Sequence, residues 1–140
     1  MHPFHRYTFA IPPEAIDRNG HVNNVEFVRW MQDAAVDHAQ AVGCTAATKA
    51  AGCTWVVRSH AIDYLRPAFA GEPIEARTWI ADYRRAFSTR KYEFHRLTDS
   101  VLLARGETNW VYVDATTGRP KSIPAQIQAL FVVADSSKAD

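Results

Sequence analysis

The 140-residue chain lacks most features of a secreted or membrane-spanning protein. Its two cysteines, Cys44 and Cys53, are too few for a disulfide scaffold, and we interpret them as ordinary thiols in or near a turn. No segment approaches the ~20 apolar residues of a transmembrane helix, and the N-terminus has no apolar run of signal-peptide length. We therefore expect a cytoplasmic protein that has no membrane partner.

An excess of charge of one sign is also missing. The chain has 16 basic and 15 acidic residues, which gives a net charge of +1. A dedicated nucleic-acid binder would carry a clear basic excess, so we expect no nucleic-acid partner. The six histidines and two cysteines do not show a metal-ligand spacing, so we predict no metal site and no cofactor. With 47% apolar residues, the chain should form one domain over residues 1–133, followed by a flexible tail at 134–140.

Hydrophobic periodicity predicts an α+β protein. The expected order is a strand at 4–10, a helix at about 24–42, strands at 54–65, 72–83, 87–98 and 101–114, and a short helix at about 123–131. The alanine-rich segment 44–53 fits either a helical turn or a loose connector. A single antiparallel sheet wrapped around one long helix leaves an edge and a face uncovered. We therefore expect at least a homodimer, with a homotetramer as the alternative.

The most informative segment is 16–30, directly before the long helix. It contains Asp17, Gly20 and His21, followed by Asn23 and Asn24. Free backbone N–H groups and the positive end of the helix dipole favour developing negative charge at such a place. The segment therefore predicts a site where a reacting carbonyl lies beside a carboxylate. From the residues alone, Asp17 has a purely structural alternative, because Asp before Asn-Gly commonly accepts hydrogen bonds from loop N–H groups.

The run Asp-x-Asn-x-His-Val-Asn-Asn, followed by Phe-x-x-Trp, resembles the opening of hotdog-fold acyl thioesterases. The 4-hydroxybenzoyl-CoA thioesterase-like family is the nearer resemblance, and the acyl-ACP thioesterases are more distant. Residues 64–68, 71–72, 117–120 and 123–124 also match this family, so the resemblance extends from residue 5 to about 131. It implies a hotdog fold, a five-stranded antiparallel sheet wrapped around one long central helix.

The resemblance also implies roles for the residues of this segment. Asp17 would act as general base or nucleophile on a thioester, and Gly20 would let the backbone approach the substrate. The backbone N–H groups of Val22, Asn23 and Asn24 would form the oxyanion hole, while Asn23 and Asn24 also fit as helix caps. Asn19 and His21 match side chains that are catalytic in the plant acyl-ACP enzymes. Pro67 and Ala68 stand where those enzymes place a further catalytic pair, so the resemblance does not carry over the whole plant mechanism. By resemblance to the bacterial enzymes, His21 is a site-shaping residue and hydrogen-bond donor, with a purely structural role in the loop as the alternative.

Tyr64 and a set of arginines are the predicted substrate-binding residues, since arginine forks suit the phosphates of CoA. They are Tyr64, Arg58, Arg66, Arg84, Arg85 and Arg90. Solvated turn charge is the alternative for each arginine. The predicted function is hydrolysis of an acyl-CoA thioester to CoA and a carboxylic acid, in lipid metabolism. Hydrolysis of acyl-ACP and non-catalytic binding of acyl-CoA remain open, and the family places the site at a dimer interface.

Overall fold

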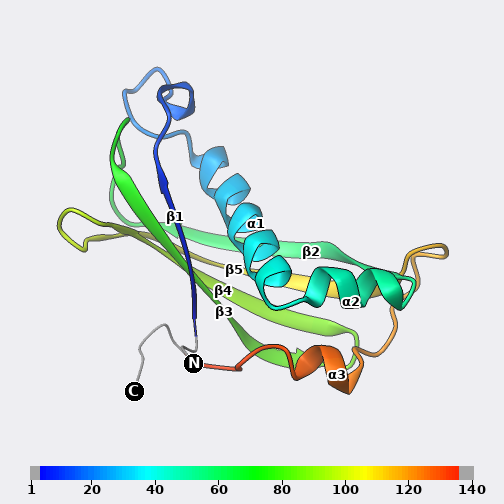
Figure 1. Ribbon diagram of the computed structural model, residues 1–140. Coiled ribbons are helices and arrows are strands. Elements are labelled where there is room, and N and C mark those ends of the chain that lie inside the picture. The colour runs from blue at the N-terminus through cyan, green and yellow to red at the C-terminus, as the bar shows by residue number, and fades with distance from the viewer. Residues whose placement is uncertain (1–3, 136–140) are drawn as a thin grey trace.

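The computed structural model describes residues 4–135, which form one curved antiparallel sheet with a long helix across its concave face (Figure 1). The elements are β1 (His5–Ala10), the 3-10 helix η1 (Pro13–Ala15), α1 (Asn24–Ala41), α2 (Cys44–Ala50), β2 (Cys53–Tyr64), β3 (Pro73–Arg84), β4 (Phe87–Arg96), β5 (Leu102–Asp114) and α3 (Ala125–Gln128). The strand order is β1-β3-β4-β5-β2, with every pair antiparallel. This confirms the predicted α+β hotdog architecture.

Two segments differ from or refine the sequence prediction. The alanine-rich segment forms the helix α2, which settles the open choice between helix and connector. At residue 134 of the expected tail, the Ala134 N–H donates to Ile80 O at 3.0 Å beside a bridge between Ile80 and Val133. This pairing ties residues 133 and 134 to β3. Residues 136–140 of the predicted tail lie outside the described residues. No helix in residues 4–135 is long and apolar enough to cross a membrane.

Helix α1 has clear start and stop signals. The side chain of its N-cap, Asn23, accepts a hydrogen bond from Val25 N–H at 3.0 Å. Gly43 follows its C-cap with φ +86°, a conformation that glycine adopts without strain. The face toward the sheet is apolar, with Trp30, Met31 and Ala34 among its buried side chains. Burial of this face, rather than intrinsic propensity, holds the helix in place.

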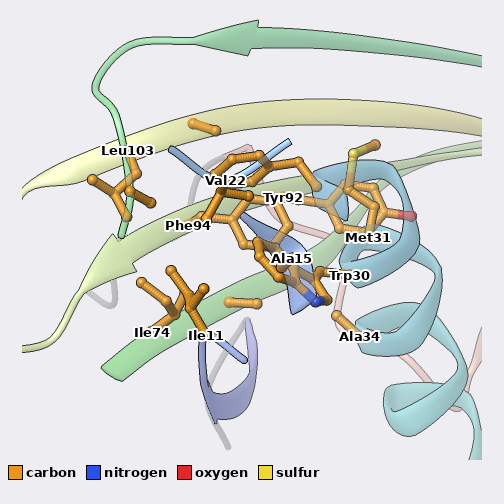
Figure 2. Close-up of a cluster of buried hydrophobic side chains, with 14 of the residues drawn as sticks. Ile11, Ala15, Val22, Trp30, Met31, Ala34, Ile74, Tyr92, Phe94 and Leu103 are labelled. Atoms are coloured by element: carbon orange, nitrogen blue, oxygen red, sulfur yellow. The ribbon is translucent and has the colours of Figure 1, made fainter. Parts of the chain in front are cut away.

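The helix packs closely onto the middle of the sheet (Figure 2). Met31 is fully buried, and a Cβ added at Gly106 of β5 would lie 3.0 Å from its Sδ and Cε atoms and 3.1 Å from Ala61 O. Around this contact the core includes Tyr92 and Phe94 from β4. The absence of a side chain at Gly106 therefore sets how closely α1 approaches the sheet.

We predict that Gly106→Val destabilises the protein by about 1–3 kcal/mol, because the added methyl groups must displace Met31 or the backbone at Ala61. Urea unfolding followed by circular dichroism measures the change. Arg105→Val is the matched control, since the neighbouring Arg105 side chain is exposed. It should cost less than about 0.5 kcal/mol. Equal stability of the two variants would contradict the close packing.

Candidate active site

The segment between η1 and α1 is a tight, hydrogen-bonded loop. Ile16 and Val22 form an antiparallel bridge, and the Asp17 N–H donates to His21 O at 2.8 Å. The Gly20 N–H donates to Asp17 O at 3.0 Å, and Gly20 itself has φ +82°. A Cβ at Gly20 would meet no atom within 4 Å. The glycine is therefore required by the left-handed backbone conformation rather than by crowding within the chain.

Asp17 is half-buried and uses one of its two carboxylate oxygens in the loop. Its Oδ1 accepts a hydrogen bond from Asn19 N–H at 2.8 Å. This is the structural role that the sequence left open. The other oxygen, Oδ2, has no hydrogen-bond partner in residues 4–135, and Asp17 lines a cavity of about 500 Å³. One carboxylate can thus hold the loop with one oxygen and offer the other to a ligand.

The backbone N–H groups at the start of α1 are less available than the sequence suggested. The Val22 N–H donates to Ala68 O and the Asn23 N–H donates to Ala15 O, both at 2.9 Å. The N–H of Val25, the second residue of α1, donates to Asn23 Oδ1 at 3.0 Å. Among the three predicted oxyanion donors, only Asn24 N–H lacks an acceptor in the described part of the chain. The prediction for Val22 and Asn23 is therefore corrected: their N–H groups anchor the helix start to neighbouring segments.

The cavity beside this loop brings together most of the predicted motif. Its lining residues are Asp17, Asn19, His21, Val22, Asn23, Asn24, Phe27, Tyr64, Leu65, Arg66, Pro67 and Ala68. The Tyr64 hydroxyl donates to Asn24 O at 3.0 Å, which fixes the end of β2 against the start of α1. Arg66 is exposed and supplies a cation at the rim. Of the predicted substrate-binding residues, only Tyr64 and Arg66 line this cavity.

The other four arginines lie elsewhere in the described chain. Arg58 stacks over the Phe87 ring at 5.0 Å, and Arg84 pairs with Asp82 at 3.4 Å. Arg85 occupies the β3–β4 turn with φ 57°. Arg90 is only 4% exposed, beneath α1, so a contact with nucleotide phosphates at the surface does not fit its position. Sequence patterning could not separate these cases, because all four arginines lie on or between strands.

The sequence reasoning did not assign site roles to Phe27 and Leu65, two of the apolar residues of the lining. Phe27 packs edge-on against Tyr64, with ring centroids 5.7 Å apart. Its helical periodicity indicated a core residue, and it is in fact 4% exposed and part of the core cluster. The same side chain thus belongs to the core and to the cavity wall. No group of three potential metal ligands occurs in residues 4–135.

Comparison with solved structures places the fold among hotdog-type thioesterases. An acyl-ACP thioesterase from Bacteroides thetaiotaomicron superposes with a TM-score of 0.86 at 20% identity, over 96% of this chain and 55% of its own. A 12:0-ACP thioesterase from Umbellularia californica gives 0.83 at 22% identity, over 98% and 53%. A 1,4-dihydroxy-2-naphthoyl-CoA thioesterase from Synechocystis gives 0.82 at 18% identity, over 91% and 94%. The chain thus spans about half the length of these two acyl-ACP enzymes.

The sequence itself identifies the family. The family model of the thioesterase-like superfamily matches residues 11–131, a range that includes the loop at Asp17, α1 and the whole of β2 to β5. The chain therefore belongs to the thioesterase-like superfamily, which confirms the family resemblance seen in the sequence. A search of curated proteins found no significant match.

The Gly20 backbone yields a prediction that separates conformation from crowding. Gly20→Val should lower the thermal stability and should reduce any thioesterase activity at least ~10-fold. The reason is that a β-branched residue strongly disfavours φ +82°. Gly20→Asn is the control, since asparagine tolerates the left-handed region and the site has open space. Thermal unfolding and hydrolysis rates of both variants check this. If Gly20→Asn lost as much activity as Gly20→Val with normal stability, close approach of a ligand would be the requirement instead.

Proposed function

We propose that the protein hydrolyses an acyl-CoA thioester to CoA and a carboxylic acid at the cavity beside Asp17. The observation that carries this proposal is the pairing of two unused groups at one cavity. Asp17 Oδ2 and the Asn24 N–H both lack hydrogen-bond partners in residues 4–135, and both residues line that cavity. A carboxylate and a helix N-terminus are the groups that attack on a carbonyl requires.

Two routes fit this arrangement. In the first, Asp17 takes a proton from water, whose oxygen adds to the thioester carbonyl. In the second, Asp17 adds to the carbonyl itself and forms a mixed anhydride that water then hydrolyses. In both routes the carbonyl oxygen becomes an oxyanion, which the Asn24 N–H and the dipole of α1 stabilise. Collapse of the tetrahedral species breaks the C–S bond, and the CoA thiolate leaves and takes up a proton.

Acyl-ACP hydrolysis is the second candidate. Two of the structural neighbours are acyl-ACP thioesterases, with TM-scores of 0.86 and 0.83. The chemistry at the carbonyl would be unchanged, and only the carrier beyond the thioester would differ. Arg66 at the rim suits the phosphate of either carrier. Rates with the same acyl group on CoA and on the carrier protein distinguish the two candidates.

We predict that Asp17→Asn lowers kcat by at least ~100-fold, because it removes the base or nucleophile with little change in volume. Release of CoA from a panel of acyl-CoA chain lengths, followed with a thiol reagent, measures the rate. Glu14→Gln is the matched control, since Glu14 is an exposed carboxylate three residues upstream. A variant within a few-fold of the parent would make Asp17 structural. Tight acyl-CoA binding by the parent without turnover would instead favour a non-catalytic binding protein.

We also propose that the active form is a two-fold dimer joined along the β2 side of the molecule. Strand β2 pairs only with β5 in the described sheet, so its other edge is open. Helix α1 exposes Val25 by 64% and Val36 by 50%, and Val36 lines one cavity together with Thr54 and Trp55 of β2. These two valines are eleven residues apart, close to three helical turns, and therefore share one flank of α1. An open strand edge beside an apolar helix flank fits a self-complementary contact.

Val36→Asp should weaken this dimer, because it places a charge on the apolar flank of α1. Light scattering should show a larger fraction of monomer, and specific activity should fall on dilution at higher protein concentrations than for the parent. Leu97→Asp is the control, since Leu97 is 44% exposed but lies beyond the end of β4. A parent protein that is a fully active monomer would overturn both the dimer and a shared site.

A further inference from the structure

A second cavity of about 460 Å³ lies near the C-terminal half of α1, between α1, α2 and the sheet. The exposed residues Thr45 and Lys49 of α2 lie at its mouth, beside Val36 of the proposed dimer contact, and buried residues such as Ile80, Ser88 and Arg90 lie at its floor. It shares no lining residue with the cavity at Asp17. Its volume falls within the usual range of small-molecule pockets.

The floor of this cavity holds a cation without a counter-charge. Arg90 is 4% exposed, and its Nη1 donates to Thr78 Oγ1 at 3.0 Å and to His38 Nδ1 at 2.9 Å. Its Nε and Nη2 atoms have no acceptor in residues 4–135, and no carboxylate of that range forms an ion pair with it. A guanidinium stays protonated under physiological conditions. A buried charge without a partner is costly, so an anion at this position would be favoured.

The histidine beside Arg90 does not supply the missing negative charge. Burial, together with the nearby Arg90 and His5 charges, lowers the pKa of His38 to about 3. His38 is therefore neutral at pH 7, and its Nδ1 accepts the Arg90 hydrogen bond while its ring stacks on His5 at 4.6 Å. Phe131 covers the guanidinium at 5.7 Å from its ring centroid. Aromatic and neutral polar groups thus surround Arg90.

Tyr83 also lines this cavity. Its hydroxyl oxygen is buried and has no hydrogen-bond partner in residues 4–135. The walls between mouth and floor are largely apolar, with Ala35, Ala39 and Trp55 among them. The cavity therefore combines an apolar passage with one positive charge at its inner end. Buried polar groups in native proteins normally have partners, so this arrangement indicates a missing acceptor.

We propose that this second cavity binds an apolar molecule that ends in a carboxylate, with the Arg90 guanidinium as its counter-charge. The apolar part occupies the passage, and the carboxylate accepts hydrogen bonds from Arg90 at the floor. Two sources share this chemistry: a free fatty acid, or the far end of an acyl chain that carries a second carboxylate. Binding of a free acid does not depend on the proposed function.

The first test uses octanoate and 1-octanol, which share a chain of eight carbons and differ in the carboxylate. Titration calorimetry at pH 7 should show that the protein binds octanoate at least ~10-fold more tightly than octanol. Arg90→Met should abolish that preference, while Arg85→Met, which removes an exposed arginine at the β3–β4 turn, should keep it. Ala39→Phe, which fills the passage and leaves Arg90 in place, should weaken binding of both probes. Circular dichroism verifies that each variant is folded.

A second test identifies the source of the carboxylate. Hydrolysis of palmitoyl-CoA is compared with that of its ω-carboxylated counterpart of equal length, because an extended chain of sixteen carbons is about as long as the ~18 Å between Asn24 and Val36 along α1. A preference for the ω-carboxylated thioester that disappears in Arg90→Met assigns the cavity to the end of a substrate. Octanoate binding that depends on Arg90, without such a preference, assigns it to a free acid. The proposal is overturned if Arg90→Met changes neither octanoate binding nor the thioester preference, or if Ala39→Phe leaves both intact.

Discussion

The contact between Met31 and Gly106 is the constraint on which the rest of the architecture depends. Because no side chain stands at Gly106, α1 lies directly on β5, and the sheet curves around it. This close packing brings the start of α1 to the end of β2, where Tyr64 donates to Asn24 O. It also brings Val22 to Ala68, whose carbonyl accepts the Val22 N–H. The walls of the candidate site are thus a consequence of how the helix sits on the sheet.

In the loop before α1, polar groups that form structural hydrogen bonds lie next to polar groups that are available for catalysis. Asp17 Oδ1 accepts the Asn19 N–H, whereas Oδ2 has no partner among the described residues. The Val22 and Asn23 N–H groups are bound to carbonyls, whereas that of Asn24 has no acceptor within residues 4–135. Such a division fixes the unused groups in position, because their immediate neighbours are tied down. A preorganised site of this kind stabilises developing charge with little rearrangement.

The secondary structure was predictable from the sequence because hydrophobic periodicity and capping residues are local signals. The α+β order, the boundaries of α1 to within about one residue and the gathering of the motif at one helix start all followed from them. The pairing of Val22 with Ala68 and of Asn23 with Ala15 could not be predicted, since backbone hydrogen bonds between distant segments leave no mark on residue identity. The burial of Arg90 was hidden for a similar reason: it depends on how α1 and α2 cover β4.

The buried Arg90 also concerns the relation between the stability of this domain and its function. Replacement of buried ionic groups by apolar residues of similar size is often neutral or stabilising in proteins. Stability alone would therefore favour a methionine or leucine beneath α1, in keeping with the neighbouring Tyr92 and Phe94. A side chain that weakens its own fold persists when it serves another purpose, and natural proteins violate packing rules mainly at such places. At Arg90, stability is thus given up for another purpose. This position lies at the opposite end of α1 from the loop that carries Asp17.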